Sequence, residues 1–166
     1  NIKPEITYSS STDVINKTAR TVTVKFDITD KHFADSIFSK GDVIGTKDSD
    51  GRILVTLNET TPIDITDNVT KTITDVVDIK DSNNNKIGET YTLQISDIKQ
   101  DSVSGDYRDF SGLIQITIKA DAAWDTSTPQ NKSLLKDFVI GETESSDGTI
   151  VDVVEPEWRD VPASDI

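Results

Sequence analysis

The chain has 166 residues, a length that fits one domain with a short additional segment. Its formal net charge is −13, with 30 acidic and 17 basic residues, which argues against nucleic acid and anionic lipid as partners because both bind clustered Lys and Arg. Cys is absent, which excludes disulfides and thiolate metal sites, and no apolar run approaches the ~20 residues that a membrane-spanning helix needs.

Strand patterns begin near the start of the chain. Residues 4–9 give a weak strand signal, and residues 21–28 then alternate apolar and polar side chains, as half-buried strands do. The apolar face of this second segment carries Val22, Val24, Phe26 and Ile28. The segment 32–41 that follows is a short helical candidate with Gly41 as its stop, and we expect a single turn that crosses from one sheet to the other.

The middle of the chain combines strand patterns with turn chemistry. Apolar runs at 42–46 and 52–57 flank an Asp-Gly step, which predicts a hairpin. A weak strand signal at 67–74 precedes the Asn-rich segment 81–88, which predicts a turn because Asn tolerates the left-handed conformation. The section 50–85 is longer than a seven-strand domain needs, and we expect it to form an inserted hairpin or an extra sheet edge.

Two clear strand patterns follow the Asn-rich turn. The first has Tyr91, Leu93 and Ile95 on one face, and the second has Ile114, Ile116 and Ile118 on one face. Weaker signals lie at 134–140 and 149–155. Strands separated by turns, with no long helical pattern, predict an all-β antiparallel sandwich.

The composition changes after Ile140. Residues 142–150 are polar and predict a linker, so we expect the sandwich to occupy residues 1–141. The last segment, 151–166, repeats three residues of the chain's start at a constant offset, matching Pro4, Glu5 and Asp13 with Pro156, Glu157 and Asp165. It is therefore expected to open a following tandem module, with a C-terminal strand of this domain as the alternative.

Four stretches of the chain carry a resemblance to a known family: "KPEITYSSS", "RTVTVKFDITDKHF", "YTLQIS" and "SGLIQITIKADAAWDTSTPQNKS". Together they resemble the bacterial immunoglobulin-like domains that occur in tandem on bacterial cell surfaces. In that family an Ile-rich strand is followed by an Ala or Gly step and then "D..gN.N"; here the Gly is absent and Pro129 intervenes, so this loop is expected to be built differently. The resemblance covers residues 1 to about 140 in patches, and it implies an immunoglobulin-like antiparallel β-sandwich with an elaborated middle hairpin.

The same resemblance implies a non-catalytic role outside the cell. The leading expectation is a structural spacer module of an adhesin-like or S-layer-like surface protein, with neighbouring tandem domains of the same chain as partners. The alternative is an adhesive module whose loops at one end bind a glycan or a host protein. The expected contacts are then Trp124 and a loop carrying Tyr107 and Phe110.

The residues themselves give little support for catalysis. His32 is the only His, and without Cys any nucleophile triad would have to include it. Its place beside a strand end favours a surface side chain at a crossover. No phosphate-binding Gly loop and no Gly-x-Ser-x-Gly motif occurs. We therefore expect no enzymatic activity and no required cofactor. A hydrolase that uses a pair of acidic residues is kept as an alternative, although no particular pair stands out in the sequence.

The acidic and lysine residues bear on two further kinds of site, a calcium site and a Lys-Asn crosslink. Calcium needs several converging oxygens, and Asp30 with Asp121 or Asp125 is the expected site, at one end of the sandwich. Some bacterial surface domains carry a Lys-Asn crosslink, which needs a buried Lys. Lys25 and Lys119 fall on the polar faces of their strands, which argues against such a bond.

Overall fold

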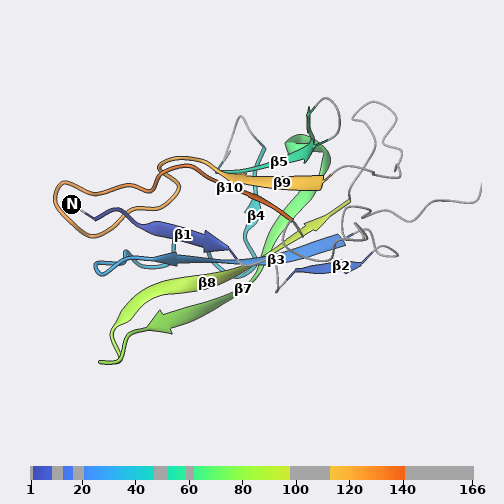
Figure 1. Cartoon of the computed structure of the whole chain (residues 1–166). Coiled ribbons are helices and arrows are strands. Elements are labelled where there is room, and N and C mark those ends of the chain that lie inside the picture. Colours follow the sequence, from blue (N-terminus) through green and yellow to red (C-terminus); the bar gives the residue numbers. More distant parts are fainter. Residues whose placement is uncertain are drawn as a thin grey trace, which may run out of the picture.

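The computed structural model (Figure 1) describes residues 2–8, 13–16, 21–46, 52–58, 62–97 and 113–140. Within these ranges the chain is all-β, with short turns, one 3₁₀ helix (η2, Thr66–Asn68) and no α-helix. No helix there has the length and apolar character needed to cross a bilayer. The predicted all-β antiparallel sandwich is confirmed.

Two antiparallel sheets pack against each other (Figure 1). The large sheet has the order β1-β3-β8-β7-β4, with β2 also paired to β3; its strands are β1 (Glu5–Tyr8), β2 (Val14–Asn16), β3 (Thr21–Thr29), β4 (Val43–Ile44), β7 (Thr70–Lys80) and β8 (Lys86–Ser96). The small sheet has the order β10-β9-β5-β6, formed by β5 (Ile53–Asn58), β6 (Ile63–Asp64), β9 (Leu113–Ile118) and β10 (Lys136–Val139). Two antiparallel sheets packed face to face form a β-sandwich.

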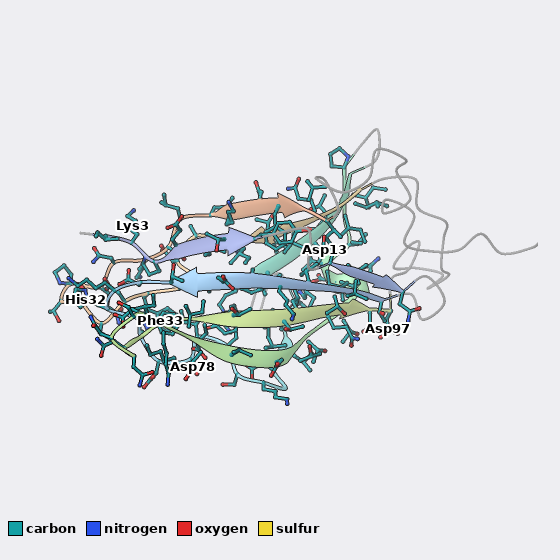
Figure 2. All side chains as sticks on the ribbon, turned by 60° about the horizontal axis from the view of Figure 1, so that its bottom comes forward. Lys3, Asp13, His32, Phe33, Asp78 and Asp97 are labelled. Carbon is teal, nitrogen blue, oxygen red and sulfur yellow. The ribbon has the colours of Figure 1, made fainter. Side chains whose placement is uncertain are left out.

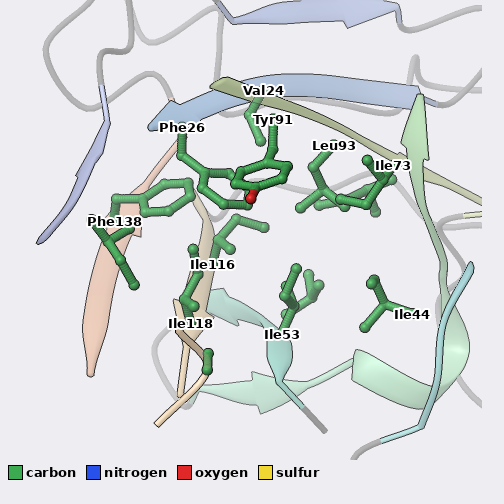
Figure 3. Packing of buried hydrophobic residues seen from close by; sticks show 14 of the residues in the cluster. Val24, Phe26, Ile44, Ile53, Ile73, Tyr91, Leu93, Ile116, Ile118 and Phe138 are labelled. Carbon is green, nitrogen blue, oxygen red and sulfur yellow. The ribbon is translucent and has the colours of Figure 1, made fainter. Parts of the chain in front are cut away.

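The alternating strands bury the faces that the sequence predicts. The apolar residues that the alternating pattern places on one face of β3, β8 and β9 are each at most 2% exposed. They pack together between the two sheets. Aromatic rings fill the centre of this core (Figure 3). Phe26 lies 5.5 Å from Tyr91, and Phe38 packs edge-on against Tyr91 with ring centroids 5.2 Å apart. The section 50–85 contains β5, β6 and β7; β6 lies at an edge of the small sheet, and β7 pairs with β8 in the large sheet.

Two expectations about connections are wrong. The segment 32–41 contains turns and bends rather than a helix, and it joins β3 to β4 within the large sheet instead of crossing between sheets. Ile37 and Phe38 are adjacent in this segment and both are buried, so the irregular backbone here contributes two neighbouring side chains to the core. The apolar runs flanking Asp50 and Gly51 do not form a hairpin either, because β4 pairs with β7 while β5 pairs with β6 and β9.

The Asn-rich turn between β7 and β8 is confirmed. The Asp81 carboxylate accepts hydrogen bonds from the backbone N–H groups of Asn83 and Asn85, both at 2.9 Å. Asn84 takes the left-handed conformation that Asn tolerates, with φ of 64°. Close to this turn Gly88 of β8 faces Thr29 of β3, and a Cβ there would lie 2.2 Å from the carbonyl oxygen of Ile28.

The sandwich has two ends, which we name from the chain's path. The proximal end holds residues 2–4, the turn after Thr29, the β7–β8 turn and the β9–β10 connection (119–135), and the distal end lies opposite. Figure 2 shows Lys3, His32, Phe33 and Asp78 at the proximal end and Asp13 and Asp97 at the distal end. The predicted boundary at residue 141 and the predicted segments 142–150 and 151–166 lie outside the described residues.

Candidate functional site

The β9–β10 connection is the most elaborate loop in the described part of the chain. It is fixed to the core by Ala122 and Ala123, which are at most 1% exposed. Ser133 returns to the same place: its N–H donates to the carbonyl oxygen of Ala123 at 2.8 Å, and its hydroxyl accepts from the Ala123 N–H at 3.0 Å. The segment between Ala123 and Ser133, which carries Trp124 and Asp125, is therefore closed at its base.

Asp125 organises the interior of this connection. One carboxylate oxygen accepts from the N–H groups of Ser127 (3.1 Å) and Asn131 (2.9 Å), and the other from the Ser127 hydroxyl (2.9 Å) and the Asn131 amide (2.7 Å). Burial disfavours the charged form, but these hydrogen bonds outweigh it and lower the pKa of Asp125 to about 2. The Thr128–Pro129 peptide inside this ring of contacts is cis.

The connection docks on the turn that follows β3. Phe33 and Asp125 form an isolated β-bridge, and the N–H of Thr126 donates to the carbonyl oxygen of His32 at 2.9 Å. In that turn one oxygen of Asp30 accepts from the His32 N–H at 2.6 Å. Two loops from different sheets thus form one surface at the proximal end. His32 is exposed, as the interpretation of a surface His predicted, although its segment does not cross between the sheets.

The structure brings Asp30 and Asp125 to the same end but does not arrange them as a calcium site. All four hydrogen-bonding positions of the Asp125 carboxylate are already used, so its oxygens would have to give up these bonds to bind a cation. Asp121 is exposed on the same connection. No group of three or more His, Asp or Glu side chains among the described residues could hold a metal ion. Calcium would have to displace existing hydrogen bonds of Asp125, and its binding at this end stays a prediction. Asp30 has one buried carboxylate oxygen with no hydrogen-bond partner within the described ranges.

Of the three expected ligand contacts, the structure describes Trp124 alone. Trp124 is half-buried at the proximal end, in an isolated β-bridge with Lys132. Tyr107 and Phe110 lie outside the described residues. The strands on either side of their segment, β8 and β9, have the adjoining ends, Ser96 and Leu113, at the distal end of the sandwich. The anchor points of the two predicted contact regions therefore lie at opposite ends of the molecule.

A buried lysine was missed by the sequence analysis. Lys25 and Lys119 are exposed, as their strand phase predicts, but Lys71 of β7 is only 1% exposed. Its ammonium group donates to the carbonyl oxygens of Gly45 at 2.8 Å and Ile53 at 3.1 Å. Gly45 follows β4 in the large sheet and Ile53 begins β5 in the small sheet, so Lys71 joins the two sheets. A period of two through Val69, Lys71 and Ile73 is the signal that predicts its burial.

A second polar group is buried beneath the 30–40 segment. Glu89 of β8 is 1% exposed and accepts hydrogen bonds from the hydroxyl groups of Tyr91 and Ser36, both at 3.2 Å. Burial, followed by the nearby Glu89 charge, raises the pKa of the Tyr91 hydroxyl well above its usual value. Lys86 lies 3.7 Å from Glu89 and 3.2 Å from Asp78, so the carboxylate is paired. This network supports the hairpin and provides no free nucleophile.

Comparison with known proteins finds no relative for this chain. No protein-family model matches it, no curated protein matches it, and no solved structure matches it.

Proposed function

We propose that this chain is a non-catalytic structural module of a tandem-domain protein on a bacterial surface. One observation supports this most: the described chain begins and ends at opposite ends of the sandwich. Residues 2–4 lie at the proximal end, beside Thr29 of β3. Strand β10 starts from the proximal connection and runs away from it, so Ile140 lies at the distal end, where its N–H bonds to Ile114.

This path suits modules joined head to tail. A domain whose two ends are far apart adds its own length to a string of domains, whereas one with adjacent ends projects sideways from it. The closed core and the hydrogen-bonded proximal connection support a stiff unit, since few groups there are left to rearrange. The net charge of −13 would oppose clumping of neighbouring modules.

The structure gives the repeated residues unequal roles. Pro4 is buried, and Glu5 is exposed on β1. Asp13 accepts a hydrogen bond from the hydroxyl group of Tyr8. The counterpart of Tyr8 at the repeat offset is Asp160, which has no hydroxyl group to donate to Asp165. The evidence for the repeat is therefore the match of Pro156 and Glu157 with Pro4 and Glu5. A tandem array needs a direct test.

The test is a fusion in which residues 1–152 are followed directly by residues 1–166, so that the joint keeps the repeat offset. Its shape is measured by small-angle X-ray scattering, and its melting curve is compared with that of the single chain. Two units arranged in line, each melting as the single chain does, are expected. A collapsed or misfolded fusion would contradict the proposal, as would a full translation of the source gene without a second copy of this pattern about every 150 residues.

A binding module is the second candidate, and the proximal surface favours it. Loops fixed by a sandwich framework are common binding sites, and here Trp124 lies on a connection held by Asp125. The test is a glycan array and a panel of extracellular proteins, probed with the wild type, Trp124→Ala and the control Lys40→Ala, which lies outside both proximal loops. Binding lost only in Trp124→Ala would favour this role, and no binding at high protein concentration would favour the spacer.

A further inference from the structure

The strands nearest the two ends of the described chain are both edge strands. Among the described strands, β1 pairs only with β3, over Glu5–Tyr8, and β10 pairs only with β9, over Lys136–Val139. Both run from the proximal end to the distal end, as the β1 arrow in Figure 1 and the register of β10 with β9 show. The chain therefore enters at the start of one edge strand and leaves at the end of the other.

This arrangement fixes how tension acts on the fold. A pull on residues 2–4 away from the proximal end draws β1 backward along β3. A pull on Ile140 away from the distal end draws β10 forward along β9. The hydrogen bonds of an antiparallel pair lie perpendicular to the strands, so both pulls load each ladder in shear, with all of its bonds stressed together.

We propose that the sandwich is a tension-bearing unit whose resistance resides in the β1–β3 and β10–β9 ladders. This deepens the proposed spacer role, on which its biological meaning rests. The two loaded strands are also coupled to each other. The Tyr8 ring of β1 stacks on the Phe138 ring of β10, with centroids 4.1 Å apart and planes 17° from parallel. Because tension moves β1 and β10 in opposite directions, this stack opposes the sliding.

The absence of Cys allows pulling handles to be placed at chosen positions in the full chain. The shear pair is Lys3→Cys with Gly141→Cys. The matched peeling pair is Lys3→Cys with Lys31→Cys, because these exposed residues are opposite each other when the Glu5–Thr29 register is continued. Pulling Lys3 and Lys31 apart opens the same β1–β3 ladder from its end, one closely spaced hydrogen-bond pair at a time.

Single-molecule force spectroscopy at one loading rate compares the two pairs. The shear pair is expected to break at about twice the force of the peeling pair or more, since a four-residue ladder is loaded as a whole rather than bond pair by bond pair. Equal forces, or a lower force for the shear pair, would overturn the inference. Neither result depends on a second module, so the fusion experiment tests the spacer role separately.

A substitution at the stack tests the coupling. Phe138→Leu keeps an apolar side chain at a position that is 6% exposed but removes the ring that meets Tyr8. The shear force is expected to fall, while the peeling force of the Lys3–Lys31 pair changes less. A melting curve first verifies that the variant is folded. An equal fractional loss in both directions would show general destabilisation and contradict the role of the stack.

Discussion

Two connections at the proximal end are built in different ways. The β7–β8 turn is held by Asp81, whose partners Asn83 and Asn85 are at most four residues away, and by Asn84 in a conformation that suits Asn. The β9–β10 connection is held by Asp125, by its base at Ala123 and Ser133, and by the turn carrying His32 in the other sheet. The first depends on local chemistry and the second on the assembled sandwich. Substitutions in the local turn should therefore lower the stability of the protein only slightly. The β9–β10 connection should respond to changes elsewhere in the sandwich.

The strongest test concerns a contact between strands, where Gly88 of β8 packs against β3. Gly88→Ala places a methyl group 2.2 Å from the Ile28 carbonyl oxygen, a contact that backbone movement alone can relieve. We expect the free energy of unfolding to fall by about 3 kcal/mol or more, measured by urea denaturation. The control is Gly41→Ala, where nothing lies within 4 Å and only the backbone conformation, with φ of 94°, opposes the change. A Gly88→Ala cost no larger than that of Gly41→Ala would contradict the close approach.

Removal of Asp125 should give the next largest effect. Asp125→Ala leaves the N–H groups of Ser127 and Asn131 without their buried acceptor. We expect the melting temperature to drop by several degrees. In a Trp158→Phe background, the emission of Trp124 should also shift to the red as its surroundings loosen. Asp121→Asn, an exposed change on the same connection, is the control and should alter neither.

The pH dependence of stability tests the charge on Asp125. Its pKa is lowered to about 2 in the fold, whereas an unfolded Asp titrates near 4, so the unfolded chain binds the proton more readily. The stabilisation is complete above pH 4 and is lost as the pH falls toward 2. The melting temperature of the wild type should therefore approach that of Asp125→Asn over this interval. A constant difference between the two proteins from pH 6 to pH 2 would refute the assignment.

The smallest expected effect is at the local turn. Asp81→Ala removes an acceptor from two exposed backbone N–H groups that water can satisfy instead, so we expect a loss of about 1 kcal/mol in urea denaturation. Amide exchange should become faster near the turn and stay unchanged in the β9–β10 connection. If Asp81→Ala instead destabilised the fold as much as Asp125→Ala, the distinction between local and assembled connections would fail.

Much of the fold could be predicted because the patterns concerned are local. Alternation identified the buried faces of β3, β8 and β9, and it needs only the period of a strand. The Asn-rich turn followed from residues within one short segment. The hairpin at Asp50 and Gly51 failed because a turn motif reports how a chain can bend and carries no information on which strands then pair.

The candidate site was less predictable than the fold. Trp124, Asp30 and Asp125 could be assigned to loops near one end, but the carboxylate of Asp125 was expected to face a cation and instead accepts four hydrogen bonds from its own loop. Those partners lie two and six residues away, at a spacing that matches no period of regular structure. Only a folded loop brings them together.

The sequence by itself determined the all-β class, the buried faces of the long strands and the absence of any sulfur chemistry, because each follows from residue type and period. The tertiary structure decided which strands are neighbours, why Phe38 enters the core from an irregular segment, and why Lys71 can be buried against carbonyl oxygens of both sheets. It also decided that residues 2–4 and Ile140 lie at opposite ends of the sandwich. These features depend on contacts between residues far apart in the chain, and neither composition nor period reports such contacts.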